Sequence, residues 1–187
     1  FTGDELVAEA TGSVTNVADT ADGNNAIAEG YKVMHGEEDV TANYVITPEA
    51  GTLTINAKAV TIAADDKTKV YGSADETLTA TIEGLVGEDK LDYSLERAEG
   101  ENVGEYEIAV TLGSNPNYDV ASTNGTYKIT KKSVTITADN KSKTYDNDKT
   151  TDPELTATVE DAVEGETISY KLSREEDQSA KSYTITV

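Results

Sequence analysis

The chain contains no cysteine and no tryptophan, and it has one histidine, His35. Without cysteine there are no disulfide bonds, no thiolate metal sites and no cysteine nucleophile. A histidine-based catalytic triad could be built only around His35, and no Gly-x-Ser-x-Gly motif is present. Among 36 acidic residues, two carboxylates close in sequence carry no information about catalysis. We therefore predict that the chain is not an enzyme.

Long apolar runs and positive charge are also scarce. No apolar run reaches the length of about 18 residues that a membrane-spanning helix needs, and no signal peptide opens the sequence. The chain has 15 basic and 36 acidic residues, which gives it a formal net charge of −21. Such a chain is repelled by nucleic acid phosphates and by anionic membrane surfaces. We expect no nucleic acid partner and no membrane insertion by this segment.

Threonine, valine and tyrosine are plentiful, which is typical of β-structure. Apolar residues alternate with polar ones, as in strands that bury one face. The alternating sets are Val60-Ile62-Ala64, Leu78-Ala80-Ile82, Leu91-Tyr93-Leu95, Tyr106-Ile108-Val110 and Tyr127-Ile129. No comparable helical stripe exists. We predict an all-β chain of small immunoglobulin-like β-sandwiches, with a β-grasp arrangement as the alternative.

The sequence repeats itself at an offset of 74 residues, since KAVTIAADDKTKVYG at 58–72 returns as KSVTITADNKSKTYD at 132–146. Residues 78–83 return at 155–160, where the offset has grown to 77, and the extra residues fall in the polar loop 147–151. Residues 43–55 match 117–129, again at 74. We predict the C-terminal part of one repeat at 1–57, a complete repeat at 58–131 and the N-terminal part of another at 132–187. Short linkers without glycine or proline predict repeats arranged end to end.

The copy that ends at Val187 lacks a counterpart of the hairpin at Asn117–Ile129. Incomplete repeats at both ends would leave strand edges unpaired. Such edges can pair with other chains, so edge-strand self-association is a further expectation.

Two acidic clusters beside predicted strands suggest a calcium site, because hard cations bind several carboxylate oxygens. The first consists of Asp146, Asp148 and Asp152, and the second of Asp65 and Asp66 with Asp75 and Glu76. Neither follows the EF-hand loop. We favour turn formation for these residues, keep calcium as the alternative for the first cluster, and expect no other cofactor.

Exposed tyrosine rings can stack on sugars. Tyr93, Tyr106 and Tyr127 share faces with leucine, isoleucine and valine, so we expect them in the core. Tyr118, which follows Pro116 and Asn117, is the candidate ligand residue, although it could instead fix the conformation of its hairpin. Lys58 and Asn117 are a weaker candidate for a spontaneous isopeptide crosslink.

The repeat resembles the MBG type of domain, in the variety marked by a Tyr-Gly pair after its first strand. Here that pair is Tyr71-Gly72, followed by Gly104-Glu105-Tyr106 and by Asn117-Tyr118 with Gly125-Thr126. In the next copy Tyr145-Asp146 replaces the Tyr-Gly pair. The resemblance implies a large, multi-repeat bacterial surface or adhesin-like protein and supplies no catalytic residues.

The resemblance and the missing cysteines together predict an extracellular location on a bacterial cell surface. We expect the segment to serve as a stalk or spacer in adhesion. The alternative is a multivalent binding module for host mucin glycans or extracellular-matrix glycoproteins, with avidity from repetition.

Overall fold

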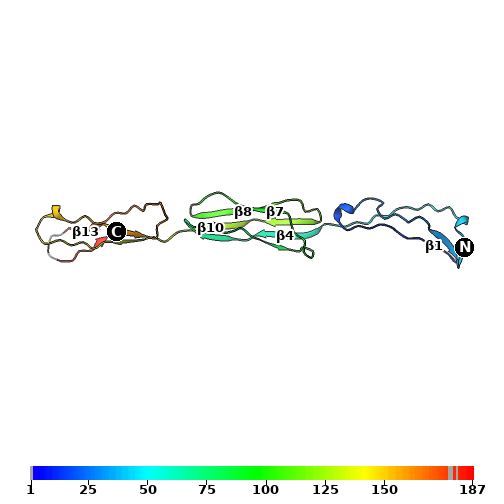
Figure 1. Cartoon of the computed structure of the whole chain (residues 1–187), viewed down its shortest axis with the longest axis horizontal. Helices are drawn as coiled ribbons and strands as arrows, with labels where there is room; N and C mark the ends of the chain where they lie inside the picture. Colours follow the sequence, from blue (N-terminus) through cyan, green and yellow to red (C-terminus); the bar gives the residue numbers. More distant parts are fainter. Residues whose placement is uncertain (1, 177–178, 180) are drawn as a thin grey trace. The chain divides into compact units, whose positions relative to one another are not determined.

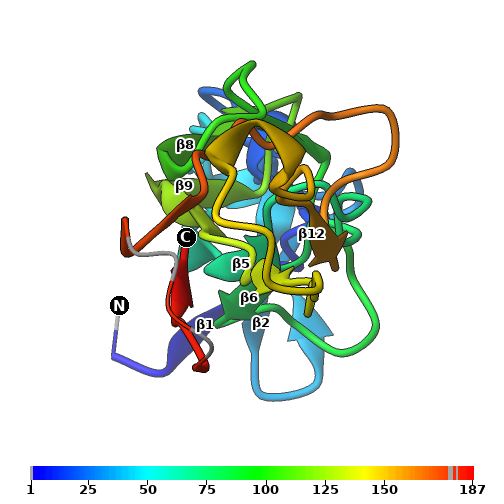
Figure 2. The ribbon, with the colours of Figure 1, turned by 90° about the vertical axis from the view of Figure 1, so that its left-hand side faces the viewer.

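The computed structural model describes residues 2–176, 179 and 181–187. Strands joined by turns and loops make up the fold (Figure 1). In the described residues the helical elements are short 3-10 turns, namely η1 (Val17–Asp19), η2 (Thr41–Asn43) and η3 (Lys149–Thr151), one of which is seen clearly in the rotated view of Figure 2. The strands are β1 (Asp4–Val7), β2 (Lys32–His35), β3 (Glu38–Asp39), β4 (Lys58–Ala64), β5 (Lys67–Val70), β6 (Ala80–Glu83), β7 (Tyr93–Arg97), β8 (Gly104–Leu112), β9 (Tyr118–Thr123), β10 (Gly125–Thr130), β11 (Thr135–Ala138), β12 (Ala157–Glu160), β13 (Ser173–Arg174) and β14 (Ile185–Thr186). The prediction of an all-β chain is confirmed.

The chain divides into two compact units. The first comprises Phe1–Asp65, Leu78–Glu96 and Ile108–Gly125, and the second comprises Asp66–Thr77, Arg97–Glu107 and Thr126–Val187. The repeat boundaries after residues 57 and 131 stay predictions.

The first unit contains a three-stranded sheet with the order β6-β4-β9. The central strand β4 is antiparallel to β6 and parallel to β9. Val60, Ile62 and Ala64 retain 2%, 1% and 8% exposure, whereas Thr61 and Ala63 between them are exposed. Leu91, 8% exposed, joins this core. The face predicted from alternation is therefore the buried one.

The same unit contains a smaller sheet, in which β2 lies between β1 and β3. Gly36 makes the turn from β2 to β3 with a φ of 60°, a left-handed conformation that glycine adopts without steric cost. Val33 of β2 is the buried residue of this sheet, at 8% exposure.

A four-stranded sheet has the order β5-β10-β8-β7. Strand β10 runs parallel to β5, with Tyr127 opposite Lys67 and Thr130 opposite Val70. Its alternate residues Gly125, Tyr127 and Ile129 are buried. Glycine is required at 125, because a Cβ atom there would lie 2.6 Å from the carbonyl oxygen of Ala64.

The strand pairing includes two parallel pairs, β4 with β9 and β5 with β10. Alternation in the sequence fixes which face of a strand is buried but not which strand lies beside it, so these pairs were not anticipated. The immunoglobulin-like sandwich and its β-grasp alternative both stay predictions.

Two short antiparallel pairs follow in the second unit. Strand β11 pairs with β12, and β13 pairs with β14. The β11–β12 pair repeats the β4–β6 pair, as the recurrence of residues 58–64 and 78–83 predicts.

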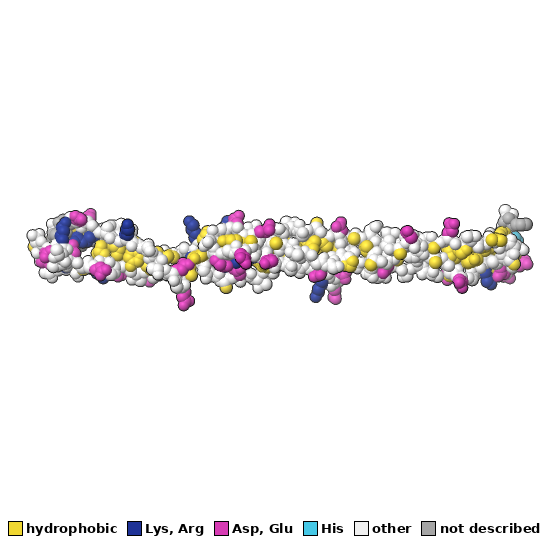
Figure 3. Space-filling view, turned by 90° about the horizontal axis from the view of Figure 1, so that it is seen from above, with side chains coloured by type: hydrophobic (Ala, Val, Ile, Leu, Met, Phe, Trp, Pro, Cys, Tyr) yellow, Lys and Arg dark blue, Asp and Glu magenta, His cyan; other side chains and the backbone are white. Residues whose placement is uncertain are grey.

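Acidic side chains are scattered over the face of the molecule in Figure 3. Among the described residues, no helix is long and apolar enough to cross a membrane.

Candidate functional site

Tyr118, the candidate ligand residue, opens β9 and is half-buried. Its ring packs against the cluster of Val60, Ile62 and Leu91. Its hydroxyl donates a hydrogen bond to the Asp89 carboxylate and accepts one from the backbone N–H of Val86 at 3.2 Å. The bond to Asp89 raises the pKa of Tyr118. This geometry ties β9 to the loop that carries Val86 and Asp89, and a ligand-stacking role stays a prediction.

Lys143 lies among the three aspartates of the predicted calcium site. Its Nζ atom is 3.0 Å from Asp146 Oδ1 and 2.7 Å from Asp152 Oδ1. Asp146 also accepts hydrogen bonds from the Thr151 hydroxyl and from the backbone N–H of Asp148. These bonds, led by the one from Thr151, lower the pKa of Asp146 to about 2.

Asp148 caps the short turn η3, since its Oδ1 atom accepts from the backbone N–H of Thr150 at 2.8 Å. The carboxylates of the cluster therefore face a lysine and turn donors, the contacts expected for turn formation. Within the described part of the chain, no group of three or more metal-ligating side chains is suitably placed for an ion. Calcium binding here stays a prediction.

The structure separates the members of the second acidic cluster. Asp65 accepts from the Thr79 and Thr81 hydroxyls at 2.6 and 2.8 Å. Asp66 accepts from the backbone N–H of Thr126 at 2.7 Å. Asp75, by contrast, faces Lys69.

Four charged side chains form a group, here named the Lys69 cluster, that consists of Lys69, Asp75, Arg97 and Glu101. Lys69 Nζ lies 2.5 Å from Asp75 Oδ1 and also contacts the Glu101 carboxylate. Arg97 bonds the same two carboxylates, at 2.8 Å to Asp75 and 2.7 Å to Glu101. The Lys69 and Arg97 side chains are only 3% and 11% exposed, against 40% for Asp75 and 65% for Glu101. The cations thus lie inward and the carboxylates cover them.

Two tyrosines complete this arrangement. The Arg97 guanidinium lies 5.4 Å from the ring centre of Tyr106 and 5.1 Å from that of Tyr127, within the range of cation–π attraction. Tyr106 donates to the carbonyl oxygen of Asn102 at 2.8 Å, and the Tyr127 hydroxyl accepts from the backbone N–H of Glu76 at 2.9 Å. Both rings are therefore engaged by their own repeat.

Electrostatics keep the Lys69 cluster ionised. Hydrogen bonds that Lys69 donates to Asp75 and, to a lesser extent, to Glu101 raise the pKa of Lys69, and the same bonds lower the pKa of each carboxyl. A lysine held protonated is a poor nucleophile, because nucleophilic attack needs the neutral amine. The cluster fits a structural role better than a chemical one.

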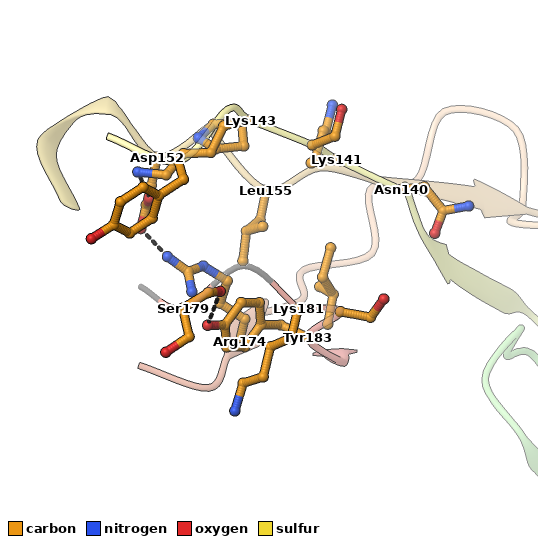
Figure 4. Close-up of a pocket in the computed structure, with 14 residues that line it drawn as sticks. Asn140, Lys141, Lys143, Asp152, Leu155, Arg174, Ser179, Lys181 and Tyr183 are labelled. Carbon is orange, nitrogen blue, oxygen red and sulfur yellow. Dashed lines mark hydrogen bonds and ion pairs between the residues drawn. The ribbon is translucent and has the colours of Figure 1, made fainter. Parts of the chain in front are cut away.

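The following copy repeats part of the cluster. Asp152 bonds both Lys143 and Arg174 (Figure 4), and Arg174 lies 5.4 Å from the ring centre of Tyr183. This cluster was not among the predicted sites. The recurrence of Lys69, Arg97 and Tyr106 as Lys143, Arg174 and Tyr183, at offsets of 74, 77 and 77, is the signal that could have found it.

The segment that follows β5 differs from its counterpart in the next copy. Gly72 of the Tyr-Gly pair has a φ of 81°, a left-handed conformation. In the next copy Asp146 stands at this position, and Asn147, one residue later, has a φ of 57°. Asparagine tolerates this conformation better than most residues, and the left-handed residue lies one position later in the copy that lacks the glycine.

His35, which is exposed, pairs with the half-buried Asp4, at 2.6 Å between Nδ1 and Oδ1. The Tyr44 hydroxyl also donates to Asp4, and this bond and then that of His35 lower the pKa of Asp4.

The candidate crosslink residues are neighbours, since the backbone N–H of Lys58 donates to the carbonyl oxygen of Asn117 at 3.0 Å. Lys58 lies opposite Tyr118 in the β4–β9 register. The Asn117 side chain accepts from the backbone N–H of Val17 at 3.0 Å and donates to Asn16 at 2.9 Å. The isopeptide crosslink stays a prediction.

Comparison with known proteins places these repeats in a family. No curated protein and no solved structure matched the chain. The family described as MBG domain (YGX type) matches residues 60–128 and 134–187, which together span more than half of the chain. Domains of this family are typical of surface and adhesin-type repeat proteins. The chain belongs to the MBG domain family of the YGX type.

Proposed function

We propose that this segment is a stalk or spacer in a bacterial cell-surface protein, holding a distal binding domain away from the cell wall. The observation that supports this most is the Lys69 cluster with its two tyrosines. Arg97, Tyr106 and Tyr127 are residue types that often anchor ligands, yet here they bond one another and nearby backbone groups. A repeat that uses these groups internally is built for its own cohesion.

The extracellular location, the bacterial source and the adhesive role of the whole protein belong to this proposal. The high acidity supports it, because a net charge of −21 keeps neighbouring stalks soluble and apart. The competing role is a multivalent module for host mucin glycans or matrix glycoproteins.

Binding measurements separate the two roles. The 187-residue chain is passed over immobilised mucin, matrix glycoprotein and a glycan array, with and without calcium. The spacer role predicts no saturable binding at high micromolar concentration. Saturable binding that is lost in Tyr118→Ala and kept in Tyr118→Phe, with both variants folded by circular dichroism, would replace the spacer by the binding module.

A further inference from the structure

The side chain of Asn117 joins two segments of the first unit that belong to consecutive predicted repeats. Its Oδ1 atom accepts from the backbone N–H of Val17 at 3.0 Å, and its Nδ2 atom donates to Asn16 Oδ1 at 2.9 Å. These partners lie 100 and 101 positions earlier in the sequence. The asparagine before β9 of one repeat therefore bonds both a backbone group and a side-chain group of the preceding repeat.

The turn that receives Asn117 is held in shape by bonds of its own. The Asp19 carboxylate accepts from the backbone N–H groups of Thr15 and Asn16, at 2.9 and 2.7 Å. The Asn16 carbonyl oxygen accepts from the Asp19 N–H at 3.0 Å, which closes the short helix η1. Because these bonds fix one conformation of the turn, the Val17 N–H and Asn16 Oδ1 are presented together, and binding Asn117 requires little further ordering.

The linker between the two repeats, residues 56–57, is tied at both ends. Before it, the Ile55 N–H donates to the Thr20 hydroxyl oxygen at 3.0 Å. After it, the Lys58 N–H donates to the Asn117 carbonyl oxygen at 3.0 Å. Thr20 directly follows η1, and the Asn117 side chain bonds the start of η1, so the linker is one side of a closed ring of hydrogen bonds. Bending at the linker must break at least one of these bonds.

Both partners of this contact recur in the sequence. The Asn-Val pair of the turn returns at 102–103, between β7 and β8. An acidic residue follows the asparagine three positions later in each case, Asp19 in the first repeat and Glu105 in the second. The Asn-Tyr pair at 117–118 has its counterpart at 43–44. The turn and the asparagine are therefore features of the repeat and not peculiarities of one loop.

We propose that the Asn-Val turn of one repeat is the docking site for the asparagine that precedes β9 in the following repeat, and that this contact locks the linker between them. The partner of the turn is thus another repeat of the same kind, with a side-chain amide at the position of Asn117. An amide suits the site because one group accepts from the Val17 N–H and donates to Asn16 Oδ1. A locked linker limits bending between successive repeats, so the functional meaning of the contact rests on the proposed spacer role.

Nuclear magnetic resonance on the 187-residue chain tests the contact from both sides. Asn117→Ala removes the acceptor, and Val17→Pro removes the donor. Proline suits position 17 because it is the first residue of η1 and because Asn16 before it is extended, with a φ of −118° and a ψ of 161°. In both variants we expect the backbone order parameters of residues 56–57, measured by amide nitrogen relaxation, to fall from about 0.85 to about 0.6.

Hydrogen exchange at the Val17 amide reports the bond itself. We expect this exchange to become about five to ten times faster in Asn117→Ala. Asn117→Asp keeps an oxygen that can accept from Val17 and should preserve the slow exchange. Asn43→Ala is the matched control, because the Asn43 side chain makes no hydrogen bond within the described part of the chain. It should change neither the exchange nor the order parameters, and unchanged amide exchange in β4 verifies the fold of every variant.

The double variant of Val17→Pro with Asn117→Ala should loosen the linker no more than either single variant, because both changes remove the same bond. Additive loosening overturns the proposal, as do unchanged order parameters in the two single variants and an equal effect of Asn43→Ala. The mucin and glycan measurements test the spacer role, whereas these measurements test the contact, so each can fail without the other.

Discussion

The same substitution at two equivalent positions should have unequal effects. Ile62 in β4 is 1% exposed and packs with Val60 and Leu91, whereas its counterpart Ile136 in β11 is half-buried. Ile62→Ala removes three buried carbon groups at about 0.8 kcal/mol each and leaves a cavity, so we expect a loss of about 3 to 4 kcal/mol. Ile136→Ala loses about half of the transfer free energy and opens no closed cavity, so we expect about 1 kcal/mol.

Hydrogen exchange resolves the two effects in one chain, because amides of β4 and β11 report the opening free energy of their own regions. Each variant is compared with the unsubstituted chain over a series of denaturant concentrations. Ile62→Ala should lower the protection of β4 by the larger amount and leave β11 almost unchanged. Equal losses for the two variants would refute the reasoning that Ile62 is fully buried in its core and Ile136 only half-buried.

Three further predictions concern single contacts. Tyr127→Phe should lower the free energy of unfolding, measured with denaturant, by about 1 kcal/mol, because it removes the acceptor of the Glu76 N–H but keeps the ring against Arg97. Tyr127→Ala also removes the buried ring and should lower it by about 3 to 5 kcal/mol. The pKa of Asp146 is lowered from 3.8 to about 2 in the folded chain, so its contribution to stability is complete above pH 3.8 and is lost as the pH falls towards 2. Asp146→Asn should therefore weaken the fall of the melting temperature at acid pH. An unchanged fall in this variant would contradict the assignment. Millimolar calcium should leave the melting temperature unchanged, because Lys143 lies between the carboxylates of Asp146 and Asp152, and a rise that is lost in Asp146→Asn would establish the calcium site instead.

The all-β class and the buried faces of the strands could be predicted from the sequence, because both follow from the local alternation of apolar and polar residues. Val60, Ile62 and Ala64 are buried as their spacing predicts, and Tyr127 and Ile129 lie on the buried face of β10. The strand partners were not predictable in this way. Parallel pairing of β4 with β9 depends on contacts across 60 residues of sequence (58 to 118), and no periodicity reports them.

The burial of the charged Lys69 cluster could not be predicted from the sequence either. Lysine is rarely buried, so composition gave no reason to place Lys69 at 6% exposure. Its partners Asp75 and Glu101 lie six and 32 residues away and meet it only through the strand arrangement. Recurrence of Lys69, Arg97 and Tyr106 in the next copy is the one trace that the sequence keeps of this cluster.

Small-angle X-ray scattering tests the spacer role most directly. The chain is compared with a version in which residues 58–131 are present twice in succession. Strands β4 and β5 follow one another in sequence over residues 58–70. At about 3.3 Å per residue, an extended segment of this length measures about 40 Å. The spacer role therefore predicts that the added repeat increases the maximum dimension by about 40 Å. An increase of that size, with an unchanged cross-section, is the result that the spacer role predicts. An unchanged maximum dimension with a larger cross-section would contradict it.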